Sequence, residues 1–441
     1  MFNPAIASEN IKDEFIDYIL SAFFIADDEY NKLFREQLNN NGVVSKGPFI
    51  DIKDIFKAGN SLDSLIDKGV LSPLYRKLEA DKPKMSGYKV NLPLSRPLYT
   101  HQEKAIDVIT SKKMNAVVTT GTGSGKTECF LIPVINELLR EKEAGTLGPG
   151  VRAILIYPMN ALANDQMKRL RNILMYYPDI TFGVYNGDTE WNEKRAEAKY
   201  NDLHFNESLE ELRTHLPNEL ISRDEMNENP PHILCTNYAM LEHMLLRPEN
   251  DKIFKNSNFK FVVLDESHIY SGATGMETAL LLRRLKARIH SESKTQFILT
   301  SATLGIEGKS EADIIKFAEN LCGEPFASEG IVYGVRDDVD YSKSNNIIPI
   351  EIYNELAYAS PEEYKNIFNK YNINYNDAAD AKENLYDLCF YSELYKHLRF
   401  IINGPIDIHI LSKELNISVE ELVSFIHVCA IAEKNRKSLI D

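Results

Sequence analysis

The sequence predicts an α/β fold in which a parallel sheet carries helices on both faces. Short, almost wholly apolar runs alternate with helical stretches through the middle of the chain, as is typical of strands that are buried on both sides. A glycine-rich loop follows the first run, and an acidic pair ends a later one. The runs that predict strands are Ala116–Val118, Ala153–Ile156, Ile233–Cys235, Phe261–Leu264 and Phe297–Leu299.

Three regions are predicted along the chain. Residues 1–84 form a helical N-terminal region, which opens with an amphipathic helix over about Ile11–Phe24, where Ile11, Phe15 and Tyr18 recur at helical spacing. Residues 85–330 hold the sheet. Within them the charged stretch 189–228 lacks a strand signal and predicts an inserted helical excursion. Residues 331–441 form a helical accessory region or the start of an insertion between two lobes.

The glycine-rich segment Thr120–Thr127 predicts a phosphate-binding loop. Its glycines allow the backbone to wrap an anion, and backbone N–H groups and the positive end of the following helix face that anion. In such a loop Lys126 reaches the β and γ phosphates, and the Thr127 hydroxyl helps to hold Mg²⁺. The usual pattern has glycine where this chain has Thr120. The predicted nucleotide contacts are Thr120, Gly121, Thr122, Gly123, Ser124, Gly125, Lys126 and Thr127.

The segment Phe261–His268 predicts the acidic partner of that loop. Four apolar residues form a buried strand, and Asp265 emerges at its carboxyl end, where it can hold Mg²⁺ through water. Glu266 can orient and deprotonate the attacking water of a phosphoryl transfer. The alternative is a buried strand that ends in a solvated acidic turn. The phosphate-binding loop upstream favours the catalytic interpretation.

Five further segments, one of them upstream of the phosphate-binding loop, occur in the order expected of one enzyme, and with them the sequence resembles a superfamily 2 helicase of the DExH type. They are Leu98–Gln102, Tyr157–Gln166, Tyr185–Thr189, Cys235–Leu241 and Ser301–Thr303. Each segment alone could be an ordinary turn or a strand end whose hydroxyls satisfy the backbone. Their order favours the family. The resemblance implies a RecA-like domain of the P-loop NTPase class, with ATP and Mg²⁺ as cofactors.

The resemblance also implies a role for each matching residue. Gln102 would contact the adenine edge, with Tyr99 as a stacking neighbour, and Ser301 and Thr303 would couple the acidic motif to the strand-binding face. His268 completes the acidic motif, so the implied catalytic residues are Lys126, Asp265, Glu266 and His268. The implied nucleic-acid contacts are Pro158, Asn160, Gly187, Thr236 and Asn237.

Within the superfamily, three segments look most like the Lhr and MrfA-like branch, whose members are mostly DNA translocases. They are Leu98–Gln102, Tyr157–Leu162 and Ala279–Leu285. This likeness implies an ATP-dependent DNA helicase or translocase, with DNA favoured over RNA, in repair or defence against foreign DNA. The alternative is a nucleotide-switched regulatory subunit that binds nucleic acid without sustained ATPase activity. The presence of Glu266 favours the enzyme.

The composition fits an ordinary globular chain of two or three domains, but its charge is unusual for a nucleic-acid motor. The 441 residues are 44% hydrophobic and 26% charged, with a net charge of −15. A motor needs only a local basic groove. Two clusters could supply one, or could be solvated helix faces: Lys168, Arg169 and Arg171, and Arg283, Arg284, Lys286 and Arg288.

The sequence shows no pattern of a targeting signal, and its cysteines are not paired in spacing, which together favour a cytoplasmic protein. Acidic residues interrupt Met1–Asp27, so no signal peptide is expected, and no apolar run approaches the length of a membrane span. The cysteines are scattered among apolar residues, with no pair at metal-ligand spacing: Cys129, Cys235, Cys322, Cys389 and Cys429. Reduced, buried thiols are expected, and no membrane partner.

The resemblance ends after Thr303. The family's second lobe carries an arginine-rich segment that reaches the γ-phosphate, yet no glutamine follows Gln296 and the chain has no Gly-Arg dipeptide. We therefore expect the first lobe of a larger or split enzyme, with a second RecA-like lobe from a continuing or separate chain. Without that lobe the chain should bind ATP and hydrolyse it poorly.

The C-terminal region predicts helices. One apolar face is marked by Leu385, Leu388, Tyr391, Tyr395, Leu398 and Ile402. Residues 408–423 resemble a helix–turn–helix in which Ser418 and Glu421 are spaced as a capping box. Two carboxylates at the start of the second helix disfavour DNA reading, so a structural helical pair or the start of an inter-lobe insertion is the alternative.

Overall fold

The chain forms two compact units in a computed structural model. One unit comprises residues 1–55 and 338–441, and the other comprises residues 56–337. The structure describes residues 3–40, 42–52, 56–80, 93–121, 123–175, 177–204, 215–255, 257–289, 294–303, 310–337, 341–342, 344–402, 404–434 and 437–439.

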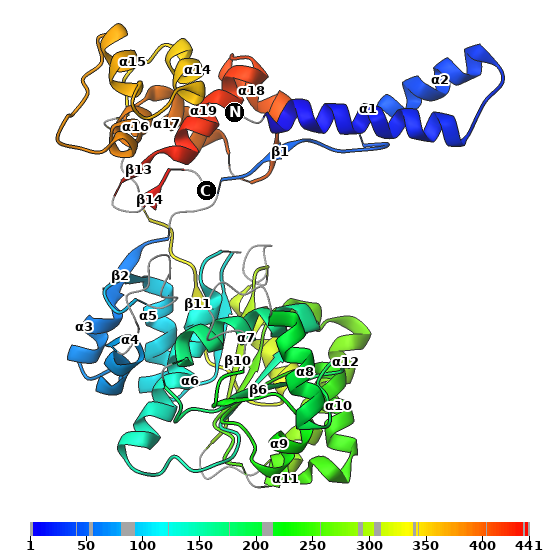
Figure 1. Ribbon diagram of the computed structural model, residues 1–441, viewed down its shortest axis with the longest axis vertical. Helices are drawn as coiled ribbons and strands as arrows, with labels where there is room; N and C mark the ends of the chain where they lie inside the picture. Colours follow the sequence, from blue (N-terminus) through cyan, green and yellow to red (C-terminus); the bar gives the residue numbers. More distant parts are fainter. Residues whose placement is uncertain are drawn as a thin grey trace. The chain divides into compact units, whose positions relative to one another are not determined.

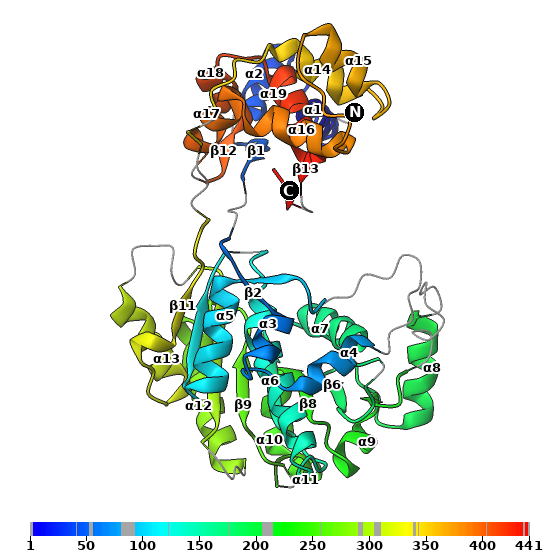
Figure 2. The same cartoon turned by 90° about the vertical axis from the view of Figure 1, so that its left-hand side faces the viewer.

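The unit of residues 56–337 is built on an eight-stranded sheet in which every neighbouring pair is parallel. The strand order is β11-β4-β10-β9-β5-β8-β6-β7 (Figure 1), and Figure 2 shows β11 on the side of α13 and β6 on the side of α8. The predicted α/β class is confirmed. The strands are β4 (Ala116–Thr119), β5 (Ala153–Tyr157), β6 (Phe182–Tyr185), β7 (Glu219–Leu220), β8 (Ile233–Asn237), β9 (Phe261–Leu264), β10 (Gln296–Ser301) and β11 (Ile331–Tyr333).

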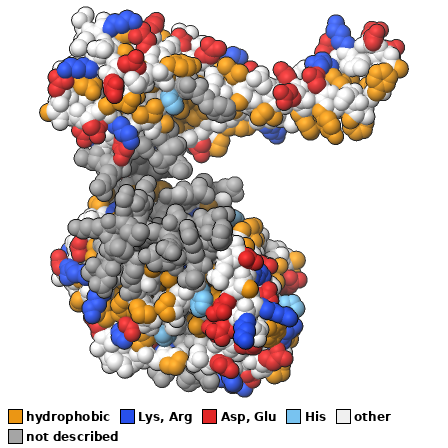
Figure 3. Space-filling view, in the orientation of Figure 1, with side chains coloured by type: hydrophobic (Ala, Val, Ile, Leu, Met, Phe, Trp, Pro, Cys, Tyr) orange, Lys and Arg blue, Asp and Glu red, His pale blue; other side chains and the backbone are white. Residues whose placement is uncertain are grey.

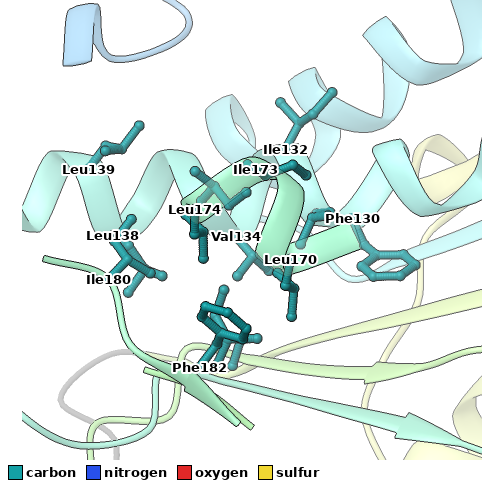
Figure 4. Packing of buried hydrophobic residues seen from close by; sticks show 14 of the residues in the cluster. Phe130, Ile132, Val134, Leu138, Leu139, Leu170, Ile173, Leu174, Ile180 and Phe182 are labelled. Atoms are coloured by element: carbon teal, nitrogen blue, oxygen red, sulfur yellow. The ribbon is translucent and has the colours of Figure 1, made fainter. Parts of the chain in front are cut away.

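Helices cover both faces of this sheet because successive strand residues point to opposite sides. Leu155 and Tyr157 of β5 pack with α6 and α7, whose buried side chains are shown in Figure 4, whereas Ile154 and Ile156 pack with the helices of the other face. The first face carries α6 (Lys126–Glu143) and α7 (Asn160–Leu174). The second carries α10 (Tyr238–Leu246), α11 (Asp251–Lys255), α12 (Gly272–Arg288) and α13 (Glu311–Cys322).

The sequence analysis did not predict three strands of the main sheet, β6, β7 and β11. The charged stretch 189–228 does contain helices α8 (Glu193–His204) and α9 (Arg223–Glu228), but the expectation that it lacks a strand was wrong, because Glu219–Leu220 form β7. Strand β6 precedes the Tyr185–Thr189 segment, which was selected by family resemblance, and shares only Tyr185 with it. Strand β11 lies beyond the predicted domain end at residue 330 and pairs with Val117–Thr119.

The division into compact units also differs from the predicted boundaries at residues 84 and 330. Residues 56–80 belong with the sheet, since Tyr75 Oη donates to the Ile132 carbonyl at 2.5 Å and Ser72 N donates to Asn136 Oδ1 at 2.8 Å. Residues 331–337 belong there through β11. The further elements of this unit are β2 (Ala58–Ser61), α3 (Leu62–Asp67), α4 (Lys77–Ala80), β3 (Pro97–Tyr99) and α5 (Thr100–Ile106).

The other unit is mainly helical and brings the two ends of the chain together. Ala5 and Ile52 share its core with residues 352–439, and β1 pairs antiparallel with β12. Its elements are α1 (Pro4–Ala22), α2 (Asp28–Asn39), β1 (Phe49–Ile50), α14 (Ile350–Tyr358), α15 (Tyr364–Lys370), α16 (Ala381–Phe390), α17 (Glu393–Ile401), β12 (Ile406–Asp407), α18 (Ile408–Leu415), α19 (Val419–Ile431), β13 (Glu433–Lys434) and β14 (Lys437–Ser438).

Helix α1 does not bury the apolar face that its sequence predicts. Ile11, Phe15 and Tyr18 are 67%, 50% and 65% exposed, whereas Ala5 and Ile16 are buried. Hydrophobic side chains gather along the helical pair α1 and α2 (Figure 3). This pair therefore presents an apolar stripe on its surface.

The helices near the C-terminus follow their sequence signals more closely. The predicted apolar face is divided between α16 and α17, because Ser392 caps a new helix by accepting from Tyr395 N. The predicted capping box is confirmed, since Ser418 accepts from Glu421 N while Glu421 accepts from Ser418 N. Helices α18 and α19 bury their apolar faces in the core of their unit.

The negative charge of the chain is concentrated outside the sheet unit. Residues 56–337 carry 35 Lys and Arg against 38 Asp and Glu, a net charge of −3, and the remaining residues carry 15 against 27, a net charge of −12. All five cysteines are buried, as predicted. Among the described residues, no helix has both the length and the hydropathy of a membrane span.

We predict that packing between α6 and the sheet dominates the stability of residues 56–337. Leu138 on α6 is fully buried, so Leu138→Ala should lower the free energy of unfolding by about 2–5 kcal/mol. The single tryptophan, Trp191, lies in this unit, so its fluorescence during urea unfolding reports on this unit alone. Leu280 on α12 is 63% exposed, and Leu280→Ala should change stability by less than about 0.5 kcal/mol. Equal losses in both variants would contradict the packing assignment.

Candidate nucleotide-binding site

The phosphate-binding loop lies between β4 and α6. Gly123 and Gly125 have φ angles of 75° and 71°, in the left-handed region that favours glycine. A Cβ atom on Gly125 would lie 2.3 Å from Gln102 Nε2. Gly121 borders open space, and Thr122 lies outside the described residues. The loop thus has the backbone that its glycines predict.

Thr120, which replaces the usual glycine, helps to close the loop. Its hydroxyl lies 2.5 Å from Ser124 Oγ, and both residues are buried. Its backbone N–H donates to the Ser301 carbonyl at 3.2 Å. The departure from the usual pattern therefore adds a side-chain hydrogen bond across the loop.

Lys126 and Glu266 face each other across the site. Lys126 Nζ lies 3.3 Å from Glu266 Oε1, an ion pair without hydrogen-bond geometry. Glu266 has φ 48°, a left-handed conformation that costs a non-glycine residue about 1 kcal/mol. This strained backbone places the carboxylate of Glu266 at the phosphate-binding loop.

Asp265 is held by Thr300, a residue that the sequence analysis did not select. The Thr300 hydroxyl donates to Asp265 Oδ1 and accepts from Glu266 N at 3.2 Å. Burial raises the pKa of Asp265, and the hydrogen bond from Thr300 opposes that shift. Thr300 precedes the matched Ser301–Thr303 segment, so the family resemblance gave no signal for it.

The residues of this site fit a nucleotide with Mg²⁺. Within the described residues, Lys126 Nζ is buried without a hydrogen-bond partner, as expected for a cation that awaits phosphate oxygens. Asp265 and Thr127 supply the hard oxygen ligands that Mg²⁺ prefers. Gln166 Nε2 on α7 lies 3.5 Å from Thr127 Oγ1. Asp265 and Thr127 would hold the metal, and Lys126 would hold the phosphates.

The first turn of α5 clamps the phosphate-binding loop. Gln102 is buried; its Oε1 accepts from Tyr99 N at 2.8 Å and its Nε2 donates to the Gly125 carbonyl at 3.0 Å. His101 Nε2 lies 2.9 Å from the Ser124 carbonyl, which can only accept, so this nitrogen carries the proton. Burial lowers the pKa of His101, which keeps the ring neutral. The side-chain amide of Gln102 thus joins Tyr99 to the loop.

An aromatic cluster adjoins the clamp and includes a residue that the sequence analysis missed. The ring of Phe56 lies 5.5 Å from that of Tyr99 and 5.1 Å from that of His101. A Cβ atom on Gly334 would touch both Phe56 and Thr120, so Phe56 lies near the loop. Phe56 stands far upstream in a region assigned to another domain, and no spacing signal marks it.

The acidic motif is linked to the end of β10. His268 Nδ1 lies 3.4 Å from Glu266 Oε2 and 3.4 Å from Ser301 Oγ. Ser301 Oγ also accepts from Thr303 N at 3.2 Å. The structure therefore brings Glu266, His268, Ser301 and Thr303 into one continuous set of contacts.

The residues with an implied nucleic-acid role lie at the carboxyl ends of β5, β8 and β6. Asn237 Nδ2 donates to Asn160 Oδ1 at 2.6 Å, and Asn160 Nδ2 donates to Asp188 Oδ2 at 3.1 Å. Pro158 is partly exposed and Gly187 is exposed. Thr236 differs from them, because it is fully buried and its hydroxyl donates to the Tyr185 carbonyl at 2.7 Å.

Most of the cations considered for a basic groove are engaged within the unit. Arg171 contacts Glu219 at 2.7 Å, and Arg169 lies 3.8 Å from Glu128. On α12, Arg284 pairs with Glu242 and Arg288 pairs with Asp251, while Lys286 and Arg283 donate to backbone carbonyls. The α12 cluster thus joins elements of its own unit.

Comparisons with known proteins agree with this arrangement. A family model described as DEAD/DEAH box helicase matches residues 99–311. The Druantia protein DruE of Escherichia coli (strain UMEA 4076-1) is 29% identical over 416 residues, covering 75% of this chain. The ATP-dependent helicase Lhr-Core of Methanothermobacter thermautotrophicus is 30% identical over 253 residues, covering 57% of this chain. A crystal structure of DUF1998 helicase MrfA bound to DNA matches 68% of this chain and 32% of that one, with 23% identity and a TM-score of 0.42.

The chain spans about a quarter of the length of these curated relatives, since the matches cover 22% of DruE and 26% of the Lhr-Core protein. The family match begins at Tyr99, directly before the clamp, and ends beyond the Ser301–Thr303 segment. It therefore contains the phosphate-binding loop and the acidic motif. Residues 99–311 are a DEAD/DEAH-box helicase domain of superfamily 2.

Proposed function

We propose that this chain is the first motor lobe of an ATP-dependent DNA helicase or translocase. One observation carries the proposal: a single sheet edge holds both the Lys126–Glu266 site and the Asn160–Asn237 pair. Strands β9 and β5 are neighbours, so the residues of the nucleotide site and the residues proposed to contact nucleic acid lie on adjacent elements. Such proximity allows one site to respond to the other.

The side chains around Glu266 have distinct roles in this proposal. Bound Mg²⁺–ATP supplies the γ-phosphoryl group and a divalent charge that stabilises its transfer. Lys126 exchanges its contact with Glu266 for phosphate oxygens. Glu266 is then free to orient a water molecule and accept its proton. Thr300 keeps Asp265 in place for the metal, and Gln102 and His101 hold the loop backbone.

A path for coupling runs through His268 and Ser301. His268 lies between Glu266 and Ser301, so a movement of the Glu266 carboxylate alters its contact with the end of β10. Asn160, Asn237, Gly187 and Pro158 contact the nucleic acid in this proposal. Thr236 supports them by fixing the end of β6, because its hydroxyl is already bonded to Tyr185.

We propose DNA as the track, that is, the nucleic acid along which the motor moves, and repair or defence as its biological role. The reason is that the motif segments most resemble the Lhr and MrfA-like branch. The sequence match to an Lhr-Core protein supports that branch. A second RecA-like lobe, from a continuing or separate chain, supplies the arginine that full catalysis requires. The limited share of each relative that this chain covers supports that requirement.

We predict that Lys126 and Glu266 affect ATP differently. Lys126→Ala should weaken ATP binding, whereas Glu266→Gln should retain binding and lower turnover at least about 100-fold, because only the proton acceptor is lost. Binding is measured with a fluorescent ATP analogue, and turnover by phosphate release with single-stranded DNA, duplex DNA or RNA. The exposed Glu277 on α12 provides the control Glu277→Gln, which should change neither quantity.

Three outcomes would contradict parts of this proposal. Unchanged turnover in Glu266→Gln would support the nucleotide-switched alternative. Stimulation by RNA but not DNA would contradict the choice of track. Rapid, DNA-stimulated turnover by the wild-type chain alone would contradict the need for a second lobe.

We predict that Thr300 positions Asp265 for the metal. Thr300→Val keeps the shape of the side chain but removes the hydroxyl, which leaves Asp265 and Glu266 N without their shared partner. The Mg²⁺ concentration that half-saturates ATP binding should rise about tenfold, as expected for the loss of a hydrogen bond to a charged group. Thr300→Ser should restore it.

The control is Thr278→Val on α12. Thr278 is also buried, but its hydroxyl has no hydrogen-bond partner within the described residues, so its removal should leave Mg²⁺ dependence unchanged. If Thr300→Val and Thr278→Val behave alike, Thr300 has no special role in the metal site.

A further inference from the structure

The single tryptophan of the chain lies outside the nucleotide site in an unusual setting. Trp191 follows the turn after β6 and is 40% exposed. Its segment is fixed to the start of α9 by two backbone hydrogen bonds, from Arg223 N to Glu190 O at 2.9 Å and from Asp224 N to Trp191 O at 3.2 Å. An exposed indole on a fixed backbone offers a flat apolar face without a large entropic cost for ordering it.

Two arginines flank this indole. The guanidinium carbon of Arg223 lies 4.8 Å from the centre of the Trp191 ring and 5.2 Å from that of Tyr185. The guanidinium carbon of Arg247 lies 5.8 Å from the Trp191 ring centre. Arg223 also donates to the Asn186 carbonyl at 2.9 Å, but its Nε is buried without a partner among the described residues.

The absence of carboxylate partners distinguishes these arginines from others in the unit. Among the described residues, neither Arg223 nor Arg247 lies within 4.0 Å of a carboxylate oxygen, whereas Arg152, Arg171 and Arg288 each do. A purely structural role, in which Arg223 holds the Trp191 segment in place, would explain the contacts of Arg223. It does not account for Arg247, which is exposed, or for the 40% exposure of Trp191.

A small cavity lies beside the cluster. Its volume is about 150 Å³, and Arg223, His243 and Arg247 line it together with Tyr185, Met240, Met244 and Asn250. The charged residues of the lining, Arg223 and Arg247, are both cationic. Such a cavity suits a phosphate group, which accepts hydrogen bonds from guanidinium donors.

The cluster continues from the residues proposed to contact nucleic acid. Asn186, whose carbonyl binds Arg223, begins the turn that carries Gly187 and Asp188, and Asp188 bonds to Asn160. Asn237 accepts from Met240 N at the start of α10, the helix that carries His243 and leads to Arg247. A nucleic-acid strand that runs from the Asn160–Asn237 pair toward the carboxyl end of β6 would therefore meet Trp191.

We propose that Trp191, Arg223 and Arg247 form a second contact for an unpaired nucleic-acid strand, in which the indole stacks on a base and the guanidinium groups hold an adjacent phosphate. The strand is unpaired because stacking on a side chain requires a free base face. This inference rests on the proposed function, since it extends the same track.

The fluorescence of Trp191 tests this directly in the full chain. Titration with a single-stranded oligothymidylate should quench the emission saturably, whereas a duplex of the same length or inorganic phosphate should have little effect. Arg247→Ala should weaken oligothymidylate binding about tenfold and reduce the dependence of log affinity on log salt by about 0.7, the contribution of one phosphate contact. Arg247→Lys should recover most of the salt dependence but not all of the affinity.

Trp191→Ala requires a labelled oligonucleotide, followed by anisotropy. The loss of one stacked base should weaken binding about 5- to 100-fold. The matched control is Arg76→Ala, which removes an equal charge from an exposed surface ion pair and should leave binding unchanged. Arg247 is exposed, so its variant should retain the urea midpoint of the parent protein.

The outcomes separate this inference from the function on which it rests. If Asn160→Ala weakens binding while Arg247→Ala and Trp191→Ala do not, the track stands and the second contact is wrong. Quenching by the duplex equal to that by the single strand would also overturn the stacking proposal. If the wild-type chain binds no nucleic acid with or without an ATP analogue, the proposed function fails as well.

Discussion

Parallel strand pairing is the constraint on which the rest of this protein depends. Because every pair in the main sheet is parallel, the carboxyl ends of its strands lie along one edge. The phosphate-binding loop, the acidic motif and the Ser301–Thr303 segment follow β4, β9 and β10, and Asn160 and Asn237 follow β5 and β8. This shared edge therefore brings together residues that are far apart in the sequence.

That edge is stiffened by hydrogen bonds that side chains make to the loop and to the acidic motif. Thr120 bonds to Ser124 within the loop, and Gln102 and His101 bond to loop carbonyls from the preceding helix. Thr300 likewise holds the acidic motif in place through hydrogen bonds to Asp265 and Glu266 N. Among the described residues, Lys126 Nζ and Glu266 Oε2 are buried without a hydrogen-bond partner, so both atoms have the spare capacity that the proposed chemistry uses.

Much of the fold and most of the nucleotide site could be predicted because their signals are local. Each of the five predicted strands is a run of apolar residues, and the loop and acidic motif are contiguous. The failures are non-local. Glu219–Leu220 became a strand through pairing with β6, Phe56 reached the loop through a distant part of the chain, and the apolar face of α1 remained exposed. The net charge of the whole chain was also a poor guide to the charge of the sheet unit, because it combines a nearly neutral unit with an acidic one.

The apolar stripe on α1 and α2 has a consequence for the colloidal behaviour of the chain. Phe23, Phe24 and Tyr30 add to it with exposed fractions of 68%, 78% and 67%. A continuous patch of large apolar side chains lowers solubility and promotes reversible clustering as concentration rises. The acidic residues of the same unit oppose this by mutual repulsion, which added salt screens. High-salt buffers, often chosen to strip nucleic acid from such proteins during purification, thus favour clustering of this chain.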